Sequence, residues 1–129
     1  MDLINRKPKD FLVISGDDAI TLPILAAGGN GVISVVGNGF PHAFSAMVKA
    51  AMNGQMDEAR RLHYLIFPIL SMLFVEGNPG GIKEATAHLG LTTNKVRLPL
   101  VNVSENTRTK IIAQTRNICE GHPYDFIKK

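Results

Sequence analysis

The stretch FLVISGDDAITLPILAAGGNGVISVV, residues 11–36, determines the fold class. Residues 11–15 form a continuous apolar run without alternation, which is typical of a strand covered on both faces in a parallel sheet. Residues 31–36 form a second such run, rich in β-branched side chains. The apolar segment between them ends at Gly28-Gly29, and glycine is a common residue at the end of a helix. We therefore predict a βαβ unit with parallel strands over about 11–16 and 31–36, joined by a right-handed crossover.

Two carboxylates, Asp17 and Asp18, stand at the start of the predicted helix. Acidic side chains are favoured there because the first N–H groups are free and the helix dipole attracts negative charge. We interpret both as helix-capping residues, since capping needs no partner outside the chain. Direct contact with a substrate is the alternative.

The remainder of the chain is predicted to be helical. Apolar residues recur with a helical period over residues 40–53 and again over 56–75, where Pro68 is expected to kink the helix. A third helix should close at Gly90, and a fourth should run from 104 to 120 after a loop over 92–103. We accordingly divide the chain into the βαβ region (1–37), the C-terminal helices (38–120) and a loose tail (121–129).

Composition narrows the functional classes. The chain has 129 residues, which suits one compact domain, and a net charge of +3 from scattered residues, so no nucleic-acid surface is expected. The single cysteine, Cys119, cannot form an internal disulfide, and residues 1–10 lack the apolar segment of a signal peptide. The longest apolar stretch, residues 65–75, falls short of the roughly 20 residues that span a bilayer. We expect a cytoplasmic protein without a membrane partner.

Metal binding is not expected either. His63 and His88 lack a neighbour at metal-ligand spacing, and His42 and Cys119 lie in other predicted segments.

Two strands alone do not complete a sheet. Each would keep an unpaired edge and an uncovered apolar face. A pair of buried parallel strands followed by four helices therefore indicates the end of a larger fold.

Three motifs in order carry a resemblance to a known family. They are SGDD at residues 15–18, GVISV at 31–35 and NPxxxK at 78–83. Together they resemble the C-terminal part of the dihydrodipicolinate synthase family, from about residue 1 to residue 117. The resemblance implies a (β/α)8 barrel, a lyase that condenses pyruvate with aspartate semialdehyde in lysine biosynthesis through a lysine Schiff base, without a metal or other cofactor. Such a barrel needs roughly 250 residues, so this chain would carry its last two strands and its C-terminal helices. Met1 would be an internal methionine of a longer ancestor or the start of a truncated gene.

The run GIKEAT, residues 81–86, resembles the motif around the family's Schiff-base lysine. The resemblance places that lysine on the sixth strand, before SGDD, whereas Lys83 follows GVISV. The apolar spacing around Lys83 also fits a helix, and the neighbouring Glu84 would favour the charged, unreactive amine. We interpret Lys83 as a helix residue; its recruitment as a new nucleophile is the alternative.

The resemblance implies substrate-binding positions for three residues and no catalytic residue. The backbone carbonyl of Ile33 would line the pyruvate pocket, and Gly16 and Asp17 would support its wall. The family's Schiff-base lysine and tyrosine relay belong to strands that this chain lacks.

Two hypotheses about function follow. In the first, the chain is a piece of a Schiff-base synthase that supplies part of the pocket wall and is inactive alone. In the second, it is a non-catalytic assembly piece that forms a homo-oligomer or complements a separate N-terminal half. Concentration-dependent association would favour the second hypothesis, and a monomer that unfolds cooperatively would count against it.

Overall fold

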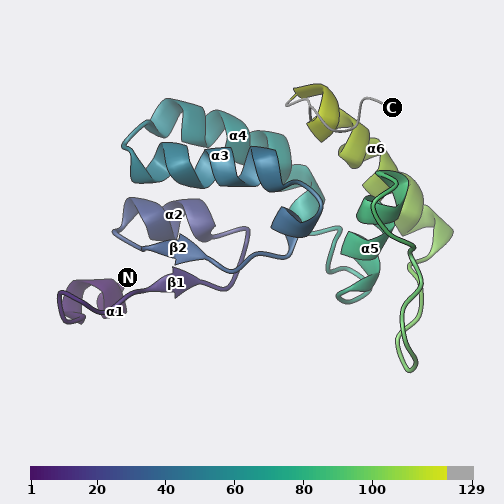
Figure 1. Cartoon of the computed structure of the whole chain (residues 1–129), viewed down its shortest axis with the longest axis horizontal. Helices are drawn as coiled ribbons and strands as arrows, with labels where there is room; N and C mark the ends of the chain where they lie inside the picture. Colours follow the sequence, from purple (N-terminus) through teal and green to yellow (C-terminus); the bar gives the residue numbers. More distant parts are fainter. Residues whose placement is uncertain (122–129) are drawn as a thin grey trace.

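The computed structural model describes residues 1–121, which begin with a short helix and a βαβ unit (Figure 1). These elements are helix α1 (Asp2–Arg6), strand β1 (Ile14–Ser15), helix α2 (Thr21–Ala26) and strand β2 (Gly31–Val32). The 3-10 helix η1 (Val36–Asn38) follows, and then come helices α3 (Pro41–Met52), α4 (Met56–Leu70), α5 (Gly80–His88) and α6 (Glu105–Gly121). Apart from Gly121, the predicted tail lies outside the described residues.

The two strands pair in parallel as predicted, but they are shorter than the predicted 11–16 and 31–36. Before β1, the strand pairing gives way to two hydrogen bonds between Asn30 and Val13. The Asn30 N–H donates to the Val13 carbonyl over 2.7 Å, and the Asn30 Oδ1 accepts from the Val13 N–H over 2.9 Å. After β2, the chain leaves the sheet because Asp18 Oδ2 accepts the N–H groups of Val35 and Val36 and so starts η1.

Helix α2 begins at Thr21, four residues later than the first predicted cap. Its N-cap residue is Ile20, which makes no side-chain capping bond. Asp17 Oδ1 instead accepts from the Ala19 N–H over 2.8 Å, within the turn before the helix. The interpretation of Asp17 and Asp18 as caps of this helix is therefore wrong, because both carboxylates satisfy loop backbone.

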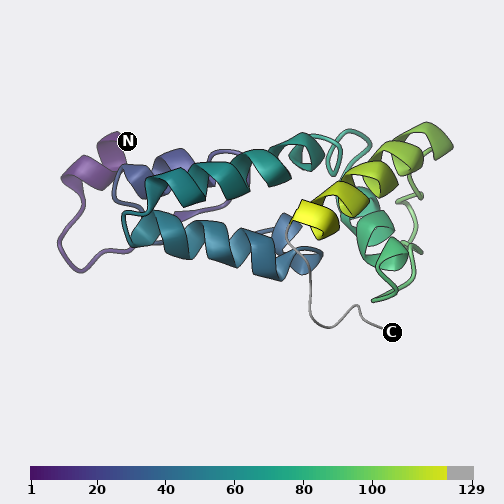
Figure 2. The ribbon, with the colours of Figure 1, turned by 90° about the horizontal axis from the view of Figure 1, so that it is seen from above.

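Helices α3 and α4 pack side by side and supply most of the core (Figure 2). They meet at a turn in which Gly54 has a φ of +75°, a conformation that favours glycine. Helix α4 ends at Leu70, whereas the prediction extended it to residue 75. Pro68 lies in its last turn and lacks the N–H that would continue the helical bonding, and the helix ends two residues later.

Helices α5 and α6 pack against each other, and α6 also contacts α4. Gly81 lets α5 approach the turn after α4 closely, because a Cβ there would lie 2.4 Å from the Leu73 carbonyl oxygen. Glu76, in the turn after α4, accepts hydrogen bonds from the Ser104 N–H (2.7 Å), the Ser104 hydroxyl (2.6 Å) and the Thr107 hydroxyl at the start of α6. These hydrogen bonds, from the Ser104 hydroxyl first, lower the pKa of Glu76.

The long connection between α5 and α6 extends to the side of the molecule on which the strands lie (Figure 1). It carries the exposed side chains Leu98, Leu100 and Val101, and the strand region carries exposed Phe11, Leu12, Ile14 and Ile33. The helices thus cover one face of the strand pair, and apolar side chains remain uncovered in the strand region.

Candidate functional site

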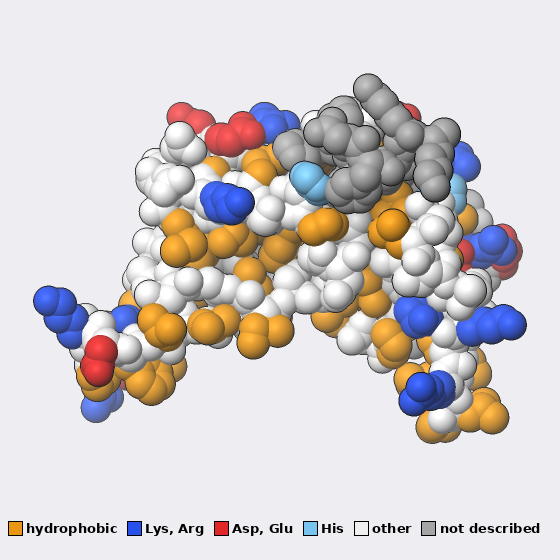
Figure 3. Space-filling view, viewed as in Figure 1, with side chains coloured by type: hydrophobic (Ala, Val, Ile, Leu, Met, Phe, Trp, Pro, Cys, Tyr) orange, Lys and Arg blue, Asp and Glu red, His pale blue; other side chains and the backbone are white. Residues whose placement is uncertain are grey.

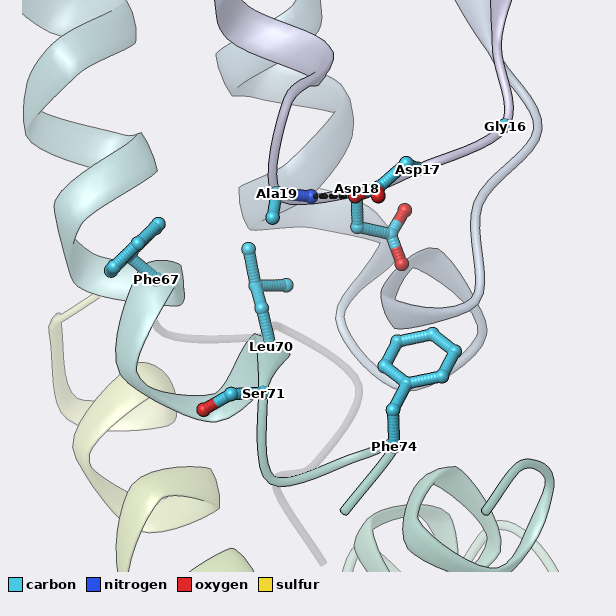
Figure 4. Close-up of a pocket in the computed structure, with 8 residues that line it drawn as sticks. All are labelled: Gly16, Asp17, Asp18, Ala19, Phe67, Leu70, Ser71 and Phe74. Atoms are coloured by element: carbon cyan, nitrogen blue, oxygen red, sulfur yellow. Dashed lines mark hydrogen bonds between the residues drawn. The ribbon is translucent and has the colours of Figure 1, made fainter.

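A cavity of about 380 Å³ opens where β1 ends (Figure 4). One wall is the loop Gly16–Ala19, and the other is the C-terminal part of α4 with the turn after it. That second wall consists of Phe67, Leu70, Ser71 and Phe74. The spacing of these four positions, at i, i+3, i+4 and i+7, brings them to one side of a helical segment.

The loop wall is held by a hydrogen-bond network between the end of β1 and the start of α2. The Thr21 hydroxyl donates to the Asp17 carbonyl over 2.8 Å, and the Ser15 hydroxyl also donates to that carbonyl, over 2.9 Å. Both Ser15 and Thr21 are buried. The position of Gly16 and Asp17 is therefore set by buried groups on either side of them.

Asp18 is a buried carboxylate in the cavity wall, with 4% of its surface exposed. Its Oδ2 accepts from Val35 N–H over 3.1 Å and from Val36 N–H over 2.8 Å, while its Oδ1 has no hydrogen-bond partner among the described residues. Asp17 lines the same cavity and is exposed. The cavity thus combines an apolar wall with two carboxylates, an arrangement that can hold or position a hydrogen-bond donor.

Ile33 is not part of the lining of this cavity. Its N–H donates to the Ser15 carbonyl over 2.9 Å, so the residue follows β2 at the level where β1 ends. Its side chain is 78% exposed. The structure therefore brings Gly16 and Asp17 together in one wall and places Ile33 on the neighbouring strand end.

Lys83 lies within α5, and the interpretation of this residue as part of a helix is confirmed. It is half-buried and does not line the cavity at β1. Glu84 is turned to other partners: it accepts from Arg108 Nε over 3.0 Å and from Asn94 Nδ2 over 2.9 Å. Glu84 thus forms a bridge from α5 to α6.

A buried histidine, His63, packs next to the apolar wall. Its ring centroid lies 5.3 Å from that of Phe67 and 5.3 Å from that of Tyr64. Burial lowers the pKa of His63, which favours the neutral imidazole. This side chain contributes to packing behind the wall.

Residues 1–121 contain no group of three or more His, Cys, Asp and Glu side chains that could hold a metal ion. Within the same part of the chain, no helix is long and apolar enough to cross a membrane.

Sequence reasoning missed the role of Asp18 and the contribution of α4. Nothing in the pair Asp17-Asp18 shows which carboxylate turns inward, because that depends on the chain folding back at Val35 and Val36. The helical spacing of Phe67, Leu70 and Phe74 was visible in the sequence, but the loop that faces them was not.

Comparisons with known proteins agree on one family. The Dihydrodipicolinate synthetase family matches residues 1–118. A 4-hydroxy-tetrahydrodipicolinate synthase of Flavobacterium psychrophilum is 52% identical over 118 residues, which are 92% of this chain and 40% of that protein. The crystal structure of dihydrodipicolinate synthase from Aquifex aeolicus superposes with a TM-score of 0.82 at 35% identity, over 93% of this chain and 40% of that one. The corresponding synthase of Methylacidiphilum fumariolicum gives a TM-score of 0.84 at 38% identity, over 92% of this chain and 41% of that one.

This chain therefore spans about 40% of the length of the relatives that it matches. The two parallel strands and the helices correspond to part of the (β/α)8 barrel of those enzymes, which confirms the predicted fold class. With its whole described core inside the matched region, the chain belongs to the dihydrodipicolinate synthase family.

Proposed function

We propose that this chain forms the C-terminal part of a Schiff-base synthase that condenses pyruvate with aspartate semialdehyde in lysine biosynthesis. The observation that carries the proposal is the cavity at the carboxyl end of β1, in a chain that is 52% identical to part of a 4-hydroxy-tetrahydrodipicolinate synthase. Active sites of (β/α)8 barrels lie at the carboxyl ends of the strands. A cytoplasmic location belongs to the same proposal.

In this function the chain positions the substrate and does not supply the nucleophile. Gly16 and Asp17 form a wall held by the buried Ser15 and Thr21, and Ile33 presents its backbone at the end of β2. In the reaction, a lysine amine adds to the keto carbon of pyruvate and water leaves, giving an iminium ion. Loss of a methyl proton then gives the enamine, which attacks the aldehyde carbon. Lys83 lies in α5 rather than on a strand. In this proposal the amine belongs to the segment that completes the barrel.

Trapping with pyruvate and borohydride tests this proposal. The chain alone should give no adduct by intact-mass measurement. Mixed with a polypeptide that comprises the remainder of the Flavobacterium psychrophilum relative, it should allow one adduct, on a lysine of that polypeptide. The variant Lys83→Arg should behave in the same way. An adduct on Lys83 would overturn the proposal, and so would the absence of any adduct in a mixture shown to form a complex.

A second candidate function is that of a non-catalytic assembly piece. It is favoured by the exposed apolar residues of the strand region, among them Leu12 at 63% and Ile33 at 78% exposure. Sedimentation velocity over a hundredfold range of concentration distinguishes the two candidates. A closed oligomer that forms without the complementing polypeptide would support the assembly role, and a monomer with cooperative unfolding would contradict it.

A further inference from the structure

A second cavity, of about 520 Å³, lies between α5, α6 and the connection that joins them. Its walls come from three parts of the chain: Ala87 and His88 in the last turn of α5, Arg108 and Ile112 in α6, and residues 93–95 in the connection. The cavity belongs to the helical region and shares no residue with the cavity at β1. It is therefore a separate candidate for ligand binding.

The net positive charge of the chain falls in the segment that contains this cavity. Residues 83–121 include six lysines and arginines and three acidic residues, which accounts for the whole net charge of +3. The remaining residues carry equal numbers of acidic and basic side chains. Figure 3 shows Lys and Arg side chains over the connection between α5 and α6. This end of the molecule therefore attracts anions.

Several hydrogen-bond donors in the lining have no partner within residues 1–121. Lys95 is exposed and forms no ion pair there, and neither the His88 ring nor the Thr93 hydroxyl makes a hydrogen bond. Arg108 uses Nε and Nη1 in ion pairs and keeps Nη2 without a partner in the same part of the chain. Because these donors come from three elements, they suit a tetrahedral oxyanion, whose oxygens accept from several directions, better than a planar carboxylate.

Glu84 contributes a carboxylate to the wall, but its charge is compensated. It is 3% exposed, and its two oxygens accept from Arg108 Nε over 3.0 Å and from Asn94 Nδ2 over 2.9 Å. The second acidic neighbour of Arg108 is Glu105, at 3.4 Å from Nη1, which is exposed and lies outside the lining. The buried carboxylate thus holds one cation of the cavity in place, and Lys95 adds a positive charge that no acidic residue compensates.

We propose that this cavity binds the phosphoryl group of a small dianion. Lys95 and Arg108 would bind its oxygens from two walls, and the Thr93 hydroxyl would donate a further hydrogen bond. Ala87 and Ile112 are half-buried and give the lining an apolar part, which fits the organic group of a phosphate monoester. Free phosphate is the other source of the same group. The proposal does not rest on the function proposed above, because the two cavities share no residue.

An NMR titration of the full chain with phenyl phosphate and with inorganic phosphate, at constant ionic strength, tests the proposal. Both should shift the amide signals of residues 93–95 and 108–112 in a saturable way. Lys95→Gln should weaken binding about tenfold, and Thr93→Val, which keeps the charge, about threefold. The matched control Arg97→Gln removes the same charge from an exposed position outside the lining and should change binding less than about twofold. Circular dichroism of each variant establishes that it is folded.

The comparison of ligands identifies the source of the phosphoryl group. Tighter binding of phenyl phosphate would support a monoester, and equal binding of the two would support free phosphate. Malonate, a dianion with planar carboxylates, should bind more weakly than either, and equal binding of malonate would overturn the phosphoryl assignment. Equal weakening by Lys95→Gln and Arg97→Gln would also overturn it, because general attraction to a positive surface would then explain the binding. The absence of saturable shifts would do the same.

Discussion

The strand region, here residues 11–15 and 31–33, and the helical region, residues 41–121, use similar apolar side chains with different results. In the helical region Ile66, Ile69 and Ile111 are each at most 1% exposed, because α3, α4 and α6 bury one another's apolar faces. In the strand region Ile14 is 48% exposed and Ile33 is 78% exposed. A helix satisfies its own backbone and needs a neighbour for only one face, whereas a strand needs neighbours at both edges and on both faces. The helical region can therefore be ordered within this chain, while the strands depend on a further surface.

The sharpest test of this contrast is a matched pair of substitutions. Ile66→Ala should lower the free energy of unfolding by about 2–5 kcal/mol, since it leaves a cavity in the core. Ile33→Ala should change it by less than about 0.5 kcal/mol, because the side chain is exposed. Urea unfolding followed by circular dichroism measures both values. Equal losses would show that Ile33 is covered in solution.

A second pair compares two neighbouring carboxylates. Asp18→Ala should destabilise the chain by about 1–3 kcal/mol, because the N–H groups of the half-buried Val35 and the buried Val36 lose their acceptor. Asp17→Ala removes one exposed bond to the Ala19 N–H and should cost about 0.5 kcal/mol, at the low end for a hydrogen bond. Thermal unfolding ranks the two variants. A larger loss for Asp17 would contradict the observed orientation of the carboxylates.

A third pair of substitutions compares a glycine in close contact with its neighbours and a glycine with open space around it. Gly81→Ala should cost about 1–3 kcal/mol, because the new Cβ would overlap the Leu73 backbone between α4 and α5. Gly16→Ala meets no atom within 4 Å and has no positive φ, so its stability should remain near that of the unmodified chain. Differential scanning calorimetry provides the measurement. If Gly81→Ala did not lower the stability, α4 and α5 could move apart at this contact without a cost in free energy.

The smallest expected effect is on the stability of the chain at low pH. Hydrogen bonds lower the pKa of Glu76 from its ordinary value of 4.5, so its contribution to stability is present above that value and is lost as the pH falls through the lowered native pKa. Glu76→Gln should therefore flatten the decline of the melting temperature below about pH 4.5. Ser104→Ala removes the hydrogen bond that lowers this pKa most and should flatten the decline in part. If neither variant changed the decline of the melting temperature at low pH, protonation of Glu76 would not contribute to that decline.

Much of the fold could be predicted because periodicity and breakers are local signals. The parallel strand pair, α3 and α5 lie where the apolar pattern and the closing glycines indicate. The length of the strands could not be predicted, since it depends on contacts of Asn30 with Val13 and of Asp18 with Val35 and Val36 that form only when the chain folds back. The site shows the same division: SGDD marks the loop at β1, but the inward turn of Asp18 depends on Val35 and Val36. The end of α4 at Leu70 depended on how the chain continues after Pro68.

The bonds between α5 and α6 have a consequence for cleavage of the chain. The exposed connection between them contains Lys95 and Arg97, which trypsin can reach. On either side of these residues, Glu84 is joined to Arg108 and Glu76 to Ser104 and Thr107. A chain cut at Arg97 keeps these attachments, so its two fragments should stay together under native conditions and separate in denaturant. This connection is therefore also the place where new termini or an inserted domain would disturb the helices least.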